Sequence, residues 1–253
     1  MKTLISLIIV IFSFGINSLS AQTVDYEIKL TQPDRSGTLK IDVYNAAIQV
    51  DGYEGKEVKL TIIDNRKGFK RKNGSAESYF RIIEDNNNVS ILKRESTPGQ
   101  VKGLKLEVLV PKSFSVNLST YFGSVIELSG INGEVEAKGY FTNLLLNGLK
   151  KSVVASTNEG NIVVVFDTIQ LPDIHFISNY KGNTEVYFPK NTKATLLIDN
   201  YFGNYDGDFK LELDASNKNN QKSKFLRRNI GGGGKEITLV NYYGNININS
   251  RKD

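Results

Sequence analysis

One short phrase recurs through the second half of this chain, and it constrains the fold more than any other feature. The phrase combines an Asn or Thr, one or two aromatic residues and a Gly, and its copies are spaced by roughly 20 residues. The clear copies read Thr120-Tyr121-Phe122-Gly123, Asn179-Tyr180-Lys181-Gly182, Asn200-Tyr201-Phe202-Gly203 and Asn241-Tyr242-Tyr243-Gly244. Two weaker copies read Gly139-Tyr140-Phe141-Thr142 and Asn158-Glu159-Gly160.

Short strand-like runs, such as residues 184–188 and 246–248, lie between the copies and predict an all-β fold. A unit of about 20 residues cannot bury its own apolar face, so we expect the copies to stack as coils of a β-solenoid. Adjacent coils would lie about 4.8 Å apart, and equivalent residues would then form ladders. A β-sandwich of short strands gives similar turn spacing and is the alternative architecture.

The chain after its first residues fits a single β-repeat domain at residues 22–253. Alternating apolar and polar residues at 24–30, 39–43 and 104–110 predict strands before the clear copies begin. Polar, basic segments interrupt the pattern near residues 64–79 and 215–235, and we expect inserted loops at both places. The last two copies are separated by about two repeats, because the second insertion falls between them.

The first 21 residues predict a secretory signal peptide. Lys2 provides a positively charged N-terminal region, residues 4–14 are almost wholly apolar, and small residues precede Gln22. The apolar run is shorter than a membrane helix, and no later stretch approaches the ~20 apolar residues that such a helix needs. We therefore expect an exported chain without a transmembrane span, located in the periplasm, at the cell surface or outside the cell.

The chain contains no Cys and one His, which narrows the chemistry it can perform. Thiolate nucleophiles, Cys-ligated metals and multi-His metal sites are excluded. The single His175 lies two residues after Asp173, but no Gly-x-Ser-x-Gly elbow accompanies the pair. No Walker loop, dinucleotide fingerprint or His-Glu-x-x-His motif occurs, so we expect no catalytic residue, no metal site and no cofactor.

The net charge is +5, and basic residues gather at 66–72 and 218–228. We interpret these stretches as solvated loops rather than as a surface for anionic polymers. Because the chain is expected to be exported, we expect no nucleic-acid partner.

Two segments carry a resemblance to a known family. They are Tyr44-Asn45-Ala46-Ala47-Ile48-Gln49-Val50-Asp51-Gly52-Tyr53-Glu54-Gly55-Lys56-Glu57-Val58 and Asn241-Tyr242-Tyr243-Gly244-Asn245-Ile246-Asn247-Ile248. They resemble the Gly-x-Ile/Val-x-Val phrases of a family of bacterial exported β-repeat proteins known as putative adhesins, over most of residues 38–248. This sequence departs from the phrase at Ala46 and Thr142. The resemblance implies a β-helix-like domain and an adhesion role, and it supplies no catalytic residues.

The aromatic residues of the repeat are the candidate binding residues. The same place in successive copies is held by Tyr121, Tyr140, Tyr180, Tyr201 and Tyr242. Neighbouring strand residues point to opposite faces, so one aromatic set can stack outside while the next stacks inside. The Tyr set is the better candidate for the outside, because its hydroxyl tolerates water. Buried stacking, or covering of a corner, is the competing interpretation.

Together these patterns predict an exported, non-enzymatic adhesin or cell-envelope binding and scaffold module, whose partner is an envelope polymer, a glycan or a protein. Two alternatives stay open. One is a polysaccharide-active β-helix enzyme, which needs two carboxylates facing one groove, drawn from Glu127, Glu134, Glu136 and Glu185. The other is a purely structural envelope protein that assembles edge to edge.

Overall fold

The computed structural model describes residues 22–65, 76–94, 103–122, 125–169, 175–209, 212–213 and 225–251. The predicted signal peptide lies outside these ranges, as do parts of both predicted inserted loops. The regular secondary structure of the described residues consists of β-strands and a single 3-10 turn, η1 (Ala76–Ser78). The prediction of an all-β fold is therefore confirmed.

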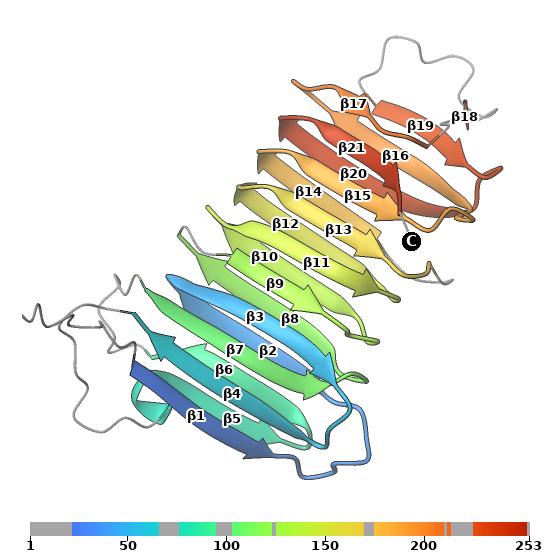
Figure 1. The fold of residues 1–253 in the computed structure, drawn as a ribbon. Coiled ribbons are helices and arrows are strands. Elements are labelled where there is room, and N and C mark those ends of the chain that lie inside the picture. The colour runs from blue at the N-terminus through green and yellow to red at the C-terminus, as the bar shows by residue number, and fades with distance from the viewer. Residues whose placement is uncertain are drawn as a thin grey trace, which may run out of the picture.

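The described strands form two large mixed sheets, drawn in Figure 1. In spatial order, the first sheet contains β1 (Gln22–Lys29), β4 (Glu57–Asp64), β7 (Leu104–Pro111), β3 (Ala46–Tyr53), β9 (Val125–Ser129), β11 (Asn143–Leu149), β13 (Ile162–Phe166), β15 (Thr184–Phe188), β21 (Ile246–Ser250) and β17 (Tyr205–Asp206). The second contains β18 (Glu212–Leu213), β19 (Phe225–Ile230), β16 (Ala194–Asn200), β20 (Lys235–Tyr243), β14 (His175–Lys181), β12 (Val153–Glu159), β10 (Val135–Tyr140), β8 (Ser115–Tyr121), β2 (Thr38–Tyr44), β6 (Asn88–Lys93) and β5 (Phe80–Asp85). Two stacked sheets are consistent with the β-sandwich alternative.

Strict alternation within the strands builds the core between the sheets. In β8, for example, Val116, Leu118 and Thr120 are buried while the residues between them are partly exposed. The same pattern in both sheets joins the buried residues into one apolar cluster. Burying one face of each strand in this way fixes its register, because a slip by one residue would turn the apolar set outward.

The chain crosses from the second sheet to the first at each copy of the repeated phrase. β8 is followed by β9, β10 by β11, β12 by β13 and β14 by β15. Within the second sheet β10 pairs in parallel with β8 and with β12 without any register shift. The phrases at the ends of these strands are therefore aligned along one edge of the molecule, with the expected ladder register.

The copies do not stack in chain order at either end. β20 pairs with both β14 and β16, so the final copy lies between two earlier ones; the red strands between orange ones show this in Figure 1. The predicted loop near residues 215–235 also contains β19, which pairs antiparallel with β16. Because both edges of β16 are hydrogen-bonded, this strand cannot pair with a strand of another chain.

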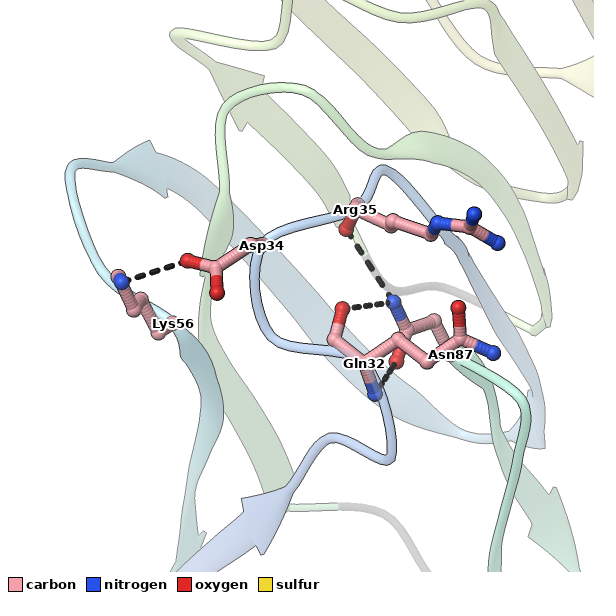
Figure 2. Close-up of polar contacts among 5 residues, drawn as sticks. All are labelled: Gln32, Asp34, Arg35, Lys56 and Asn87. Atoms are coloured by element: carbon pink, nitrogen blue, oxygen red, sulfur yellow. Dashed lines mark hydrogen bonds and ion pairs between the residues drawn. The ribbon is translucent and has the colours of Figure 1, made fainter.

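The loop that follows β1 is held on the tip of the β5–β6 hairpin by Asn87, as Figure 2 shows. The Asn87 amide nitrogen donates to the carbonyl oxygens of Gln32 at 2.6 Å and Arg35 at 3.2 Å, and its amide oxygen accepts from the Gln32 N–H at 2.9 Å. Asn87 is buried and has a positive φ of 66°. An exposed ion pair between Lys56 and Asp34, at 2.6 Å, adds a weaker contact to the same loop.

We expect Asn87→Ala to lower the free energy of unfolding by about 2 kcal/mol, because the loop backbone loses three side-chain hydrogen bonds in a buried place. The matched control is Asn86→Ala, since Asn86 also has a positive φ, of 50°, but is exposed. Urea denaturation of the two variants separates the contribution of the Asn87 side-chain hydrogen bonds from that of backbone strain. Equal losses of stability in both variants would contradict a stabilising role of these hydrogen bonds.

Candidate functional site: an exposed aromatic ladder

A similar three-residue corner ends β2, β8, β10, β12, β14, β16 and β20 of the second sheet. The first corner residue is most often an Asn or Thr, and it is buried at Thr120, Thr157, Asn179 and Asn241. The second is usually Tyr and the third is often Phe or Tyr. Because the strands are parallel and in register, the second and third residues form two columns along the edge.

The first column, here called the tyrosine column, faces water. In spatial order it contains Tyr44, Tyr121, Tyr140, Asn158, Tyr180, Tyr242 and Tyr201. Exposed fractions of the tyrosines lie between 37% for Tyr121 and 47% for Tyr180, except that Tyr242 is half-buried. The interpretation in which the tyrosines stack inside the core is therefore wrong.

The third corner residues are exposed as well, so the alternation of the strand ends at this corner. This second column contains Phe122, Phe141, Glu159, Lys181, Tyr243 and Phe202, and its aromatic members are 39–58% exposed. The backbone explains the change of direction, since Phe122 and Phe141 have positive φ values of 68° and 56°. Positive φ is rare for bulky residues and costs about 1 kcal/mol or more at each. Backbone strain of this kind is concentrated at functional sites.

The rings of the two columns contact one another in two groups. In one group, Tyr44 and Tyr121 have ring centroids 5.0 Å apart, and Phe122 stacks on Phe141 at 6.1 Å. In the other, Tyr180 stacks on Tyr242 at 5.2 Å with an angle of 14° between the rings. Contacts along each column are stacked or tilted, whereas contacts between the columns, such as Tyr140 with Phe141, are edge to face.

The inward Asn and Thr side chains stabilise the corner rather than the surface. Asn179 donates to the carbonyl oxygen of Gly160 at 2.9 Å, and Thr157 donates to that of Thr142 at 2.9 Å. Asn241 makes the same kind of bond to Gly182 at 3.2 Å. These bonds satisfy backbone carbonyl groups that the turn removes from the sheet.

A column of Asn side chains lies just past the corner, and it was not predicted from the sequence. The amide oxygens of Asn143, Asn161 and Asn183 each accept from the backbone N–H of the next member, at 2.8–3.0 Å. Asn245 accepts in the same way from Asn204 at 3.1 Å. The signal was present, because these residues directly follow the Gly, or Thr142, of each copy.

Opposite charges flank the two ends of the tyrosine column. At one end Lys93 donates to the Tyr44 hydroxyl at 2.9 Å, and its ammonium lies 4.1 Å from the centre of the Tyr44 ring. This hydrogen bond raises the pKa of Lys93. At the other end a hydrogen bond to the Asp199 carboxylate, and the negative charge of that group, raise the pKa of Tyr201. At neutral pH the lysine is therefore charged and the tyrosine neutral.

The other candidate residues lie apart from this ladder. His175 is buried beside Phe166, with ring centroids 5.1 Å apart, while Asp173 lies outside the described residues. Among the described residues, no group of three His, Cys, Asp or Glu side chains is placed to hold a metal ion. In the same part of the chain, no helix is long and apolar enough to cross a membrane.

The carboxylates considered for catalysis are divided between the sheets. Glu127 and Glu185 lie on the first sheet with two strands between them, about 14 Å apart. Glu134 and Glu136 line a shallow hollow of about 400 Å³ on the second sheet. Glu136 there forms an ion pair with Lys138.

Tyr44 and the second column are missing from the candidate residues that the sequence indicates. The degenerate copy around Tyr44 has Ala where the others have Gly, which hides its place in the ladder. Because neighbouring strand residues point to opposite faces, the sequence pattern assigns the aromatic residues of the second column to the inner face. These residues are Phe122, Phe141, Phe202 and Tyr243. With these residues included, the fold and its edge define an all-β protein with an exposed aromatic surface.

Comparison with known proteins supports the fold. No family model matches the chain, and no curated protein matches it. The fold is similar to that of a putative cell adhesion protein from Clostridium sporogenes, at 12% identity over 92% of this chain and 100% of that chain, with a TM-score of 0.50. Similar solved structures include putative adhesins from Bacteroides fragilis (12% identity, 92% and 98% covered, TM-score 0.29) and Parabacteroides distasonis (8%, 92% and 98%, 0.28). The resemblance to bacterial adhesin-like proteins is thus confirmed at the level of the fold.

Proposed function

We propose that this protein is an exported, non-enzymatic adhesin or cell-envelope binding module, and that the aromatic ladder is its binding surface. We further propose that the paired sheets are the two walls of a β-solenoid. Support for the solenoid comes from the crossing between sheets at each copy and from the parallel, unshifted pairing of β8, β10 and β12.

The observation that carries the proposed function is the exposure of aromatic residues in two adjoining columns. Large, contiguous exposed apolar patches mark interaction sites on soluble proteins. The strained backbone at Phe122 and Phe141 adds to this, since ordinary turn residues would avoid that cost. The fold of the Clostridium sporogenes protein is used only as an analogy, because one fold serves many functions.

The two alternatives receive less support. The separation of about 14 Å between Glu127 and Glu185 exceeds the ~5–9.5 Å typical of glycosidase carboxylate pairs. Glu134 and Glu136 do line one hollow, but the Glu136 carboxylate is already engaged by an ion pair with Lys138 and a hydrogen bond from Asn117. Edge-to-edge assembly is disfavoured at the β1 edge of the first sheet, because Asp25, Glu27 and Lys29 are exposed along that strand.

We expect simultaneous replacement of Tyr121, Tyr180 and Tyr201 by Ala to weaken binding to the partner strongly. The partner is found by screening the wild-type protein against isolated peptidoglycan, envelope polysaccharides and envelope protein extracts. Loss of three ladder rings should weaken binding by about tenfold to a thousandfold, at about 0.5–1.5 kcal/mol for each aromatic contact.

The matched control is Phe176→Ala. Phe176 is 39% exposed and lies on the outer face of β14, away from the ladder. Circular dichroism of both variants establishes that they are folded. A folded triple variant that binds as tightly as the wild-type protein would refute the ladder as the binding surface.

A further inference from the structure

The aromatic ladder contains two pairs of tyrosines whose rings are close together and tilted. One pair is Tyr201 and Tyr242, whose ring centroids lie 4.9 Å apart with an angle of 36° between the rings. The other pair is Tyr44 and Tyr121, at 5.0 Å and 47°. In a tilted pair the edge of one ring approaches the other ring, whereas in a parallel stack the faces meet. Each pair therefore needs only small side-chain rotations to bring together the ring carbons next to the hydroxyl groups.

The composition of the chain directs oxidation to its tyrosines. The side chains of Cys, Trp and Met usually compete with Tyr for oxidants. This chain has no Cys and no Trp, and its one Met is Met1. Tyr201 and Tyr44 are 40% and 39% exposed, so an oxidant can reach both phenol groups from solution. We therefore expect a one-electron oxidant to react first with the exposed tyrosines.

The two pairs differ in the charged group that contacts the outer tyrosine. The Tyr201 hydroxyl donates a hydrogen bond to the Asp199 carboxylate, which can accept the phenol proton when the ring loses an electron. In the other pair the Lys93 ammonium donates to the Tyr44 hydroxyl at 2.9 Å and lies 4.1 Å from the centre of the ring. An ammonium group accepts no proton, and its positive charge opposes the loss of an electron. Tyr201 is therefore the more easily oxidised of the two.

The backbone holds the Tyr201 and Tyr242 rings next to each other. The Tyr201 N–H donates to the carbonyl oxygen of Asn241 at 3.0 Å, and β16 and β20 pair in parallel up to this corner. Tyr242 is half-buried, and its other neighbour in the column, Tyr180, is nearly parallel to it, at 14°. A radical on Tyr242 is thus enclosed by rings of its own chain, and Tyr201 is the tilted partner in the same column.

We propose that Tyr201 and Tyr242 form a modification site, at which a one-electron oxidant joins their rings by a carbon–carbon bond as a dityrosine cross-link. Each phenol loses one electron and one proton, and the Tyr201 proton passes to Asp199. The two radicals couple at the carbons next to their oxygens, and the hydrogen atoms of those carbons move to the oxygens, which restores both phenols. A haem peroxidase with hydrogen peroxide is the matching oxidant, because one peroxide takes up both electrons and both protons to form water. The cross-link ties β16 to β20, and it does not require the ladder to be a binding surface.

The test treats the purified protein with a haem peroxidase and limiting hydrogen peroxide. Dityrosine fluorescence measures the rate of cross-linking, and a denaturing gel separates linked monomers from linked dimers. Mass spectrometry of tryptic peptides then locates the bond. We expect residues 194–210 and 236–251 to be joined within the monomer, with the loss of two hydrogen atoms, about tenfold or more faster than the other tyrosine pair.

Three variants assign the roles of the groups. Tyr242→Phe should remove the cross-link, because Phe has no hydroxyl group to oxidise. Asp199→Asn should slow the reaction about tenfold or more, because an amide is a poor proton acceptor. The matched control is Asp42→Asn, since Asp42 precedes Tyr44 by two residues as Asp199 precedes Tyr201, and it should leave the rate unchanged. Circular dichroism establishes that each variant is folded.

Each outcome bears on the site. A cross-link between Tyr201 and Tyr242 within the monomer, slowed by Asp199→Asn and not by Asp42→Asn, supports it. An equal rate at the other tyrosine pair, or an unchanged rate in Asp199→Asn, overturns the role of the carboxylate as proton acceptor. Dityrosine that forms only between molecules, or no dityrosine at all, overturns the modification site.

Discussion

Phe166→Ala is expected to lower the free energy of unfolding by about 3–5 kcal/mol, a large fraction of the stability of an ordinary domain. Phe166 is fully buried between the sheets. Its ring stacks on Phe188 with centroids 5.4 Å apart and an angle of 12°, and meets His175 edge to face at 5.1 Å. Alanine leaves a cavity that neighbouring strands cannot close, because their spacing is fixed by hydrogen bonds on both sides. Urea denaturation monitored by circular dichroism measures the loss.

Phe176→Ala provides the comparison for this change. Phe176 is 39% exposed, so we expect its replacement to cost about 1 kcal/mol or less. A loss at Phe176 equal to that at Phe166 would show that the assignment of inner and outer faces of β14 is wrong.

Gly182→Ala is expected to lower the free energy of unfolding by about 2–5 kcal/mol, through overpacking and backbone strain together. A Cβ atom at Gly182 would lie 2.0 Å from the carbonyl oxygen of Gly160 in the neighbouring corner. The residue also has a φ of +134°, which side-chain-bearing residues rarely adopt. Because Gly244 in turn approaches Gly182 to a similar degree, the change disturbs the corner between two strands.

Gly232→Ala separates the two causes. Gly232 also has a positive φ, of +86°, but no atom lies within 4 Å of a Cβ built there. Its replacement therefore reports the strain alone, at about 1 kcal/mol. If both variants lose the same stability, close stacking of the corners is not the reason for the glycines.

Much of this fold could be predicted because its signals are local. Alternation within each strand predicts which residues are buried, and the recurring Asn-Tyr phrase predicts which residues lie in the same column. Tyr121, Tyr140 and Tyr180 can therefore be placed in one column from sequence alone, and the structure places them so. The corner hydrogen bonds of Asn179 also follow from the ordinary behaviour of Asn at turns.

The exposure of the ladder could not be predicted in the same way. Alternation along β8 assigns Tyr121 to the outer face and Phe122 to the inner one. The strand ends at Tyr121, however, and the positive φ of Phe122 turns its ring outward as well. The insertion of β20 between β14 and β16 was also beyond prediction. Equivalent copies offer the same local contacts in any stacking order, so only the whole chain selects one.

The measurement that tests the ladder most directly is affinity as a function of ligand length, using size-fractionated fragments of the polymer that binds in the screen. From Tyr44 to Tyr201 the tyrosine column spans six strand spacings, about 29 Å. If the whole column binds, affinity rises with fragment length up to about this span and then stays constant, and the rise is lost in the triple tyrosine variant. Affinity that is independent of length, or that rises equally in the triple variant, would contradict an extended aromatic binding surface.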